Sequence, residues 1–221
     1  THVSILPESE IVVYGRFQTE SSMQIPLILW KPPAFAEKVD KEKLILGLYF
    51  GVMLAMLFYN LFIFIFLKDR NYLYYVFYIG IFILTQMGVS RLDIMYLWTQ
   101  FPLFANISHA VFFNLTFFFG GLFCRNFLNT KETAVYLDKA VLLMMWICII
   151  GVALTFISGY SAGIKCVVYF GAVLGPVFML SAGISCWIKG NSIAKYYTLA
   201  WSVFLIAAIF FNLRNMGILP S

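Results

Sequence analysis

Five polar side chains interrupt otherwise apolar runs of this 221-residue chain and are the first candidates for chemistry. They are four amides and one imidazole: Asn60, Gln86, His109, Asn114 and Asn212. Polar groups are expensive in hydrocarbon, so each needs a reason to be there. Each can hydrogen-bond across a helix interface, which is typically worth about 0.6–2 kcal/mol. We expect these residues to serve in helix packing, with a part in signalling as the alternative and a pH response as a further alternative for His109.

Carboxylates are missing from the same runs, and Asp93 lies only at the end of one. Transporters driven by protons or sodium usually need buried carboxylates, so the pattern argues against them. The sequence holds only one other histidine, His2, and its four cysteines follow no metal-binding spacing. The sequence therefore nominates no catalytic residue, no metal site and no cofactor, and we expect the cysteines to be small buried apolar residues.

The composition decides the class of protein. Hydrophobic residues make up 62% of the chain and charged residues 11%, compared with about 25% charged in soluble domains. Such a chain cannot cover a globular surface with polar groups, so the lipid bilayer is its expected surrounding. The net charge of +5 then concerns membrane orientation and gives no reason to expect nucleic acid.

Six apolar runs are long enough to cross a membrane as helices. They cover residues 44–67, 72–90, 102–123, 140–158, 164–188 and 194–213. The first would be about 36 Å long, and it carries small residues at every fourth position, Gly47, Gly51 and Ala55, which form one packing face. We expect a mainly α, polytopic helical membrane bundle over residues 44–221, with antiparallel neighbours.

The first 43 residues differ from the rest. Glu10–Gln18 and Met23–Trp30 resemble two strands joined by a polar turn, and we assign residues 1–31 to the last strands of an extracytoplasmic β domain. Residues 32–43 are expected to be a linker, because Pro32 and Pro33 block regular strand pairing.

Lysines and arginines in the short loops favour an outside amino end. The inner corners then hold Lys68, Arg70, Arg125, Lys131, Lys139, Lys189 and Lys195, and the outer ones hold Arg91, Lys165 and Arg214. Lys38, Lys41 and Lys43 would also lie outside, beside three acids, which weakens the charge argument for this orientation. Six spans would end outside, so a receptor that signals inward needs a seventh helix beyond Ser221.

The order of several short motifs resembles a known bacterial family, the seven-transmembrane receptors with diverse intracellular signalling modules. The matching residues are Gly47, Tyr49, Gly51, Tyr59, Asn60, Asp69, Tyr72, Leu73 and Tyr75, with "FCRNFLNTKE" and "AKYYTLAWSVFLIA" further along. "VVYGRFQTESSMQIPLILW" is similar to the closing strands of the jelly-roll-like outer domain of many members.

The resemblance implies a multi-pass sensor in the inner membrane. An outer domain would bind a carbohydrate or another small molecule, and a cytoplasmic output module, such as a diguanylate cyclase or a histidine kinase, would respond. Only the last strands of the outer domain, and no output module, are expected in this chain. A homodimer is a further partner to consider. The alternative from the residues alone is a small transporter or channel subunit, with a hydrated path lined by Asn60, Gln86, His109 and Asn114.

Overall fold

The computed structural model describes residues 12, 30–166 and 174–215. The predicted β-hairpin over residues 10–30 therefore lies, apart from Val12 and Trp30, outside the described residues. The chain divides into two units, Thr1–Ile45 and Leu46–Ser221.

The first helix, α1, runs from Pro32 to Leu67 and is 36 residues long. Residues 32–43, which we expect to be a linker, are thus helical. Proline is well tolerated in the first turn of a helix, where its missing N–H group would have no partner. Farther on, Lys41 Nζ lies 2.6 Å from Glu37 Oε1, one turn away, which gives this polar stretch a further reason to be helical.

The remaining described residues form eight more helices. They are α2 (Arg70–Val89), α3 (Leu92–Tyr96), α4 (Pro102–Phe127), α5 (Thr130–Thr133), α6 (Val135–Ser158), α7 (Tyr160–Cys166), α8 (Leu174–Ile188) and α9 (Ala194–Asn215). The prediction of a mainly α bundle is confirmed for the described part of the chain. The short α3 and α5 were not expected, and the fifth predicted span contains the last three residues of α7 and all of α8.

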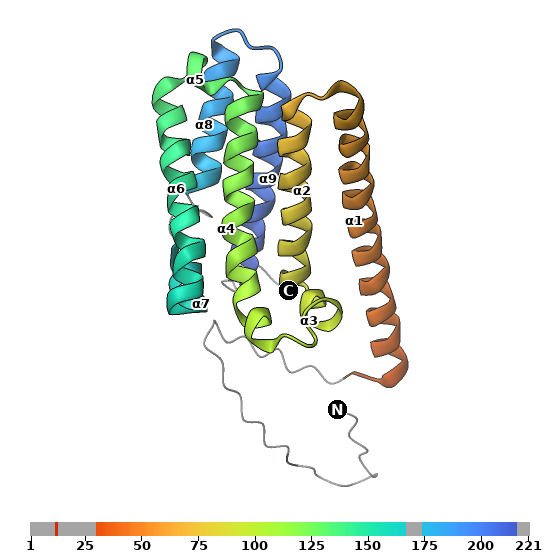
Figure 1. Cartoon of the computed structure of the whole chain (residues 1–221). Coiled ribbons are helices and arrows are strands. Elements are labelled where there is room, and N and C mark those ends of the chain that lie inside the picture. Colours follow the sequence, from red (N-terminus) through yellow and green to blue (C-terminus); the bar gives the residue numbers. More distant parts are fainter. Residues whose placement is uncertain (1–11, 13–29, 167–173, 216–221) are drawn as a thin grey trace. The chain divides into compact units, whose positions relative to one another are not determined.

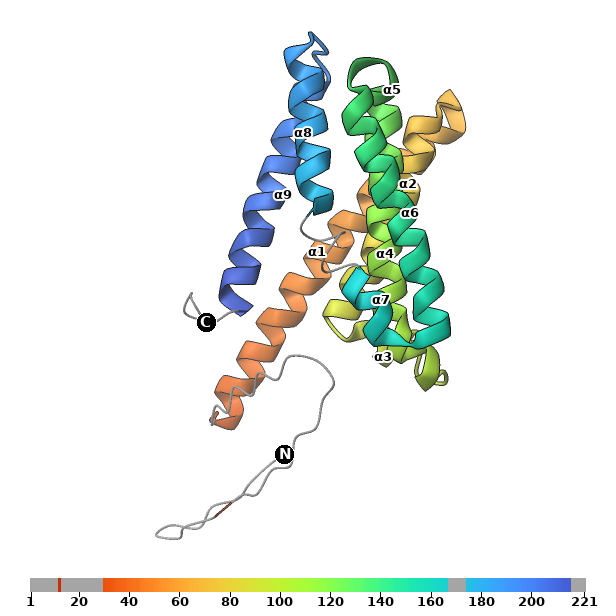
Figure 2. The same ribbon diagram turned by 90° about the vertical axis from the view of Figure 1, so that its left-hand side faces the viewer.

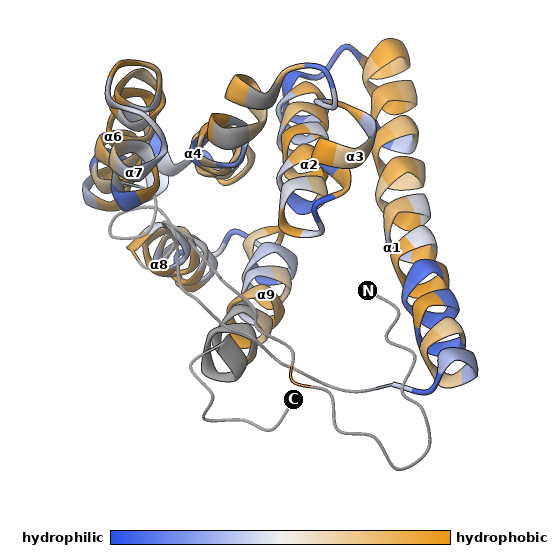
Figure 3. Ribbon diagram, turned by 90° about the horizontal axis from the view of Figure 1, so that it is seen from below, coloured by the Kyte–Doolittle hydropathy of each residue, from blue (hydrophilic) through white to orange (hydrophobic). Residues whose placement is uncertain are grey.

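Within Leu46–Ser221 the helices pack in two layers (Figure 1). Helix α4 lies between α2 and α6 and packs closely on both. The α8–α9 pair covers one side of this layer, and its two helices run antiparallel (Figures 2 and 3). Because successive long helices alternate in direction, α3 and α7 lie at one end of this unit, and α5 lies at the other (Figure 1).

Four of the described helices have the length and apolarity to cross a membrane. They are α1, α2, the Ile107–Phe127 part of α4, and α6, and α8 is a shorter apolar helix of 15 residues. Apolar residues predominate along these helices when they are coloured by hydropathy (Figure 3). The chain is therefore a multi-pass membrane protein.

Aromatic rings pack between the layers, and a glycine allows the close approach of α8 and α9 within one layer. Phe123 packs on Tyr197 of α9 with ring centroids 6.3 Å apart. A Cβ atom on Gly183 of α8 would lie 2.7 Å from Thr198 Oγ1 and 2.9 Å from Tyr197 Cδ1, so only glycine lets α8 and α9 approach this closely. The predicted burial of cysteines is confirmed for Cys124, Cys148 and Cys186, and Cys166 has no described side chain.

The charged corner between α1 and α2 owes its geometry to one cap. Lys68 adopts a left-handed conformation (φ 55°), and Asp69 then accepts a hydrogen bond of 2.9 Å from the Asn71 N–H group. We expect Asp69→Ala to lower the free energy of unfolding by about 1 kcal/mol, because this N–H group loses its partner. Asp69→Asn keeps an acceptor oxygen and should stay close to wild type.

Equilibrium unfolding of the purified protein in detergent would measure both variants. Equal losses for alanine and asparagine would show that charge, and not capping, matters at this corner.

Candidate functional site

Asn114 lies at the junction of three helices. It is fully buried in α4, and its Nδ2 group donates to the Ala110 carbonyl at 2.8 Å and to the Gly163 carbonyl of α7 at 3.3 Å. Its Oδ1 atom accepts no hydrogen bond from the described residues. Asn114 thus links α4 to α7, as an interhelical amide would.

Two glycines that the sequence reasoning missed make this junction possible. A Cβ atom on Gly151 of α6 would collide with Asn114 Oδ1, and one on Gly163 would collide with the Thr155 hydroxyl. The Thr155 hydroxyl itself donates to the Gly151 carbonyl at 2.7 Å. Glycines that stand singly in apolar runs gave no repeat, so the sequence offered no signal that they face a partner.

One end of the bundle is held by a buried carboxylate. Asp93 in α3 is 3% exposed and accepts hydrogen bonds from the Ile94 N–H group at 2.8 Å and the Ser108 hydroxyl of α4 at 3.3 Å. A Cβ atom on Gly88 of α2 would lie 2.9 Å from His109 Nδ1 and 3.5 Å from Asp93 Oδ2. The carboxylate and the imidazole therefore come close together over Gly88, although the sequence gave His109 no carboxylate neighbour. We call Gly88, Asp93, Ser108 and His109 the α3-end cluster.

The opposite end of α4 carries an ion pair. Arg125 donates through Nε and one terminal nitrogen to the two carboxylate oxygens of Asp138 in α6, at 2.7 and 2.9 Å. The Thr130 hydroxyl of α5 adds a third hydrogen bond to Asp138, at 2.6 Å. Both charged side chains are only 10–13% exposed, so this bidentate pair fixes α4, α5 and α6 to one another. We call Arg125, Thr130 and Asp138 the α5-end clamp.

Helix α8 is attached next to the clamp. The Thr133 hydroxyl of α5 lies 3.0 Å from Cys186 Sγ, and Lys189 Nζ donates to the Thr133 carbonyl. Lys189 was expected only to set orientation, but it also closes a contact between α5 and the end of α8.

The first-helix residues behave differently from Asn114. Asn60 is the one buried residue among those described in α1, and its Nδ2 group donates to the Met56 carbonyl of the same helix at 2.8 Å. A Cβ atom added at Gly47 or Gly51 would have no other atom within 4 Å, and Ala55 is exposed. The predicted small-residue face therefore has no partner in the described part of the chain.

The other predicted polar residues are less connected. Gln86 is half-buried and makes no side-chain hydrogen bond to the residues that the structure describes. Asn212 lies near the end of α9, and its side chain falls outside the described part of the structure.

The residues predicted to set orientation gather at the α5 end of the Leu46–Ser221 unit. This end contains the α1–α2 corner, the α4–α6 connection and the α8–α9 turn (Figure 1). The cations there include Lys68, Arg70, Arg125, Lys189 and Lys195. Within residues 30–166 and 174–215, no three His, Cys, Asp or Glu side chains gather as a metal site would require.

One comparison with known proteins identifies a family for this chain. A family model described as "7TM diverse intracellular signalling" matches residues 42–221, most of the chain. The chain belongs to this family. Searches of curated proteins and of solved structures found no match. The membership makes this chain a transmembrane signalling domain and confirms the resemblance drawn from the motifs within residues 42–221. The likeness of residues 12–30 to a jelly-roll outer domain lies outside the match and stays a prediction.

The contacts of Asn114 predict that replacing two different glycines of this signalling domain by alanine will have very different effects on its stability. Gly151→Ala should lower the free energy of unfolding by about 1–3 kcal/mol, because its methyl group would overpack against Asn114. Gly47→Ala is the matched control, since a methyl group there meets open space and alanine favours the helix.

Thermal unfolding in detergent would compare the two variants, and Gly151→Ala combined with Asn114→Ala should recover part of the loss. Equal effects of the two glycine variants would contradict the assignment of a close contact at Gly151.

The α5-end clamp predicts that arginine geometry matters there as well as charge. Arg125→Lys keeps the charge but loses the bidentate hydrogen bonds, so we expect it to lower the free energy of unfolding. Arg125→Ala should lower the free energy of unfolding further, by about 3–5 kcal/mol, because it removes one partner of a buried ion pair. The control is Lys41→Ala, which breaks an exposed pair and should change stability by less than about 0.5 kcal/mol.

Chemical unfolding monitored by tryptophan fluorescence would give all three values. A lysine variant as stable as wild type would show that the bidentate geometry contributes nothing.

Proposed function

We propose that this chain couples a ligand-binding domain outside the membrane to an output module in the cytoplasm. Membership of the 7TM signalling family supports a sensor role. The single observation that carries the coupling is the pattern of polar contacts along α4, which holds neighbouring helices at both of its ends.

Helix α4 can act as the connecting element. It is 26 residues long, about 39 Å, and so reaches from one membrane surface to the other. Ser108 and His109 place its first turns in the α3-end cluster, and Arg125 places its last turns in the α5-end clamp. A shift of α3 caused by a ligand outside would move α4, and that movement would change the contacts of α5, α6 and α8 inside.

The transporter or channel alternative receives less support. None of its four path residues, Asn60, Gln86, His109 and Asn114, hydrogen-bonds to another in the described structure. Asn60 bonds within α1, and Asn114 is fully buried against α6 and α7. The amide N–H groups used in these bonds are not available to a continuous file of water.

Coupling from outside to inside requires a particular orientation of the chain in the membrane. The α5 end, with its cations, would face the cytoplasm of a bacterial inner membrane, and the amino end would face outward. A carbohydrate or similar small molecule would be sensed through the outer domain. The output would be an attached enzyme, such as a diguanylate cyclase or a histidine kinase, with this chain supplying no catalytic group.

Reporter insertions at the two ends of the bundle test this direction. A reporter that is active only in the cytoplasm should work when it is inserted after Gly190, in the α8–α9 turn at the α5 end. The same reporter inserted after Gly159, between α6 and α7, should be inactive. The two insertion points are matched, because each glycine has positive φ and open space beside it.

The reverse pattern would place the α5 end outside, and coupling toward an inner output would then have to run in the opposite direction. Fluorescence in intact cells, normalised to the amount of inserted protein, gives the result.

A further inference from the structure

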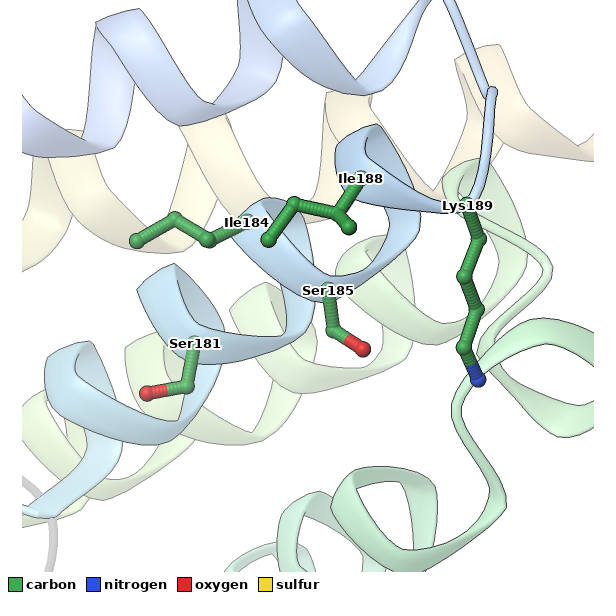
Figure 4. Close-up of a pocket in the computed structure, with 5 residues that line it drawn as sticks. All are labelled: Ser181, Ile184, Ser185, Ile188 and Lys189. Carbon is green, nitrogen blue, oxygen red and sulfur yellow. The ribbon is translucent and has the colours of Figure 1, made fainter.

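A groove along α8 combines polar and apolar side chains at the α5 end. Its volume is about 310 Å³, and Ser181, Ile184, Ser185, Ile188 and Lys189 line it. Ser181, Ser185 and Lys189 follow one side of α8 at intervals of four residues, and the two isoleucines lie along the neighbouring side (Figure 4). The groove is therefore amphipathic along its length, with its positive charge where the helix ends.

Its polar groups have hydrogen-bonding capacity left. The Ser181 hydroxyl donates to the Val177 carbonyl at 2.8 Å, so its oxygen remains an acceptor only. The Ser185 hydroxyl bonds to none of the described residues. The Lys189 ammonium uses one of its three N–H groups on the Thr133 carbonyl, which positions it and leaves two free.

The end of α8 does not repel an anion as a bare helix carboxyl end would. The N–H groups of Lys189, Gly190 and Asn191 bond to the carbonyls of Ser185, Trp187 and Cys186, at 3.0–3.2 Å. Gly190, with φ 95°, allows this closing turn. These hydrogen bonds satisfy most of the last carbonyl groups of α8 and so reduce the partial negative charge at this helix end. The positive charge of Lys189 offsets the negative charge that remains.

The charges around the groove select the sign of its occupant. Exposed lysines at the same end of the unit include Lys131, Lys139 and Lys195. Three acids also lie there: Asp138 is paired with Arg125, whereas Asp69 and Glu132 accept hydrogen bonds from Asn71 and Asn129 and keep their charge. The seven lysines and arginines at this end outnumber them. The net field at this end is positive, which favours a negatively charged ligand.

We propose that this groove binds one anionic phospholipid from the leaflet next to the α5 end. The headgroup phosphate would accept hydrogen bonds from Lys189 and Ser185, and an acyl chain would lie along Ile184 and Ile188. The groove volume is at the small end for a ligand site, which suits a headgroup with the first part of a chain. Basic pockets at the ends of membrane helices bind lipid headgroups through the same chemistry.

Lipid occupancy would also affect the bundle. Because Lys189 bonds to Thr133 as well, the phosphate would strengthen the contact between α8 and α5, next to the Arg125–Asp138 pair. The composition of the leaflet would therefore bias the same end of the bundle that the proposed output reads.

Spin-labelled lipids in reconstituted vesicles test the proposal. The full chain is placed in phosphatidylcholine vesicles with a trace of labelled phosphatidylglycerol or labelled phosphatidylcholine, and the fraction of motion-restricted label is measured. We expect a clear preference for phosphatidylglycerol, weakened about fivefold in Lys189→Gln, the effect of one lysine near an anionic surface. Lys189→Arg should keep the preference, and Ser185→Ala should reduce it.

The matched control is Lys195→Gln, which removes an exposed cation at the same end that lies over the Tyr196 ring and outside the groove. Equal losses for Lys189→Gln and Lys195→Gln would overturn the proposal, because they would mean that only the general surface charge attracts the lipid. Displacement of the labelled lipid by excess inorganic phosphate would also overturn it, in favour of a site for free phosphate. No preference for phosphatidylglycerol in the wild-type chain would do so directly.

Discussion

The structure depends on the inability of hydrocarbon to accept or donate hydrogen bonds. Many polar side chains within the helices respond in one way: they donate to the carbonyl four residues earlier in the same helix. The pairs are Asn60 to Met56, Thr85 to Ile81, Asn114 to Ala110, Thr116 to Phe112, Thr155 to Gly151, Ser181 to Val177, Thr198 to Ala194 and Ser202 to Thr198. Each helix can therefore enter the membrane with these polar groups satisfied. The Thr85 and Thr116 hydroxyls also lie 2.8 Å apart between α2 and α4, where one of them donates to the other and shares its single proton between this bond and the carbonyl of its own helix.

Charges follow the same constraint by moving to the helix ends. Arg125 and Asp138 lie at the end of α4 and the beginning of α6, and they satisfy each other with two short hydrogen bonds before either is fully removed from water. Asp93 lies at the other end and uses backbone and hydroxyl donors in place of a cation. The middle of the bundle relies instead on ring contacts and on glycines that admit a neighbouring side chain. Directional polar contacts thus hold the ends, and contacts without strong direction hold most of the middle, where the Asn114–Gly163 and Thr85–Thr116 hydrogen bonds are the directional exceptions.

The sequence correctly predicted four helices that are long and apolar enough to cross a membrane, because the length of an apolar run is set by the thickness of the bilayer. It predicted the helix ends less well, because helices such as α1 and α4 continue into polar residues that no longer look like a span. Asn60 and Asn114 show a deeper limit. Both are amides in apolar runs, yet one bonds only within its helix and the other also bonds to α7. The difference comes from which helix lies opposite, and residue spacing reveals a face without revealing its partner. For the same reason the Gly47–Gly51–Ala55 pattern predicted a packing face, whereas the close contacts occur at Gly151, Gly163 and Gly183.

This division of contacts suits the proposed coupling. Packed aromatic and methionine side chains, such as Met144 and Met145 against Gly121, tolerate small sliding movements because no single bond must break. A bidentate pair such as Arg125–Asp138 has few favourable geometries, so it is either made or broken. Small movements that accumulate along α4 would therefore be converted into a discrete change at its end. Asn114 would be the natural pivot, because its bond to the Gly163 carbonyl resists sliding of α4 against α7 at the middle of α4. A ligand-driven displacement of α3 would then tilt α4 about Asn114 and pull on the α5-end clamp, and α8 would follow through Thr133.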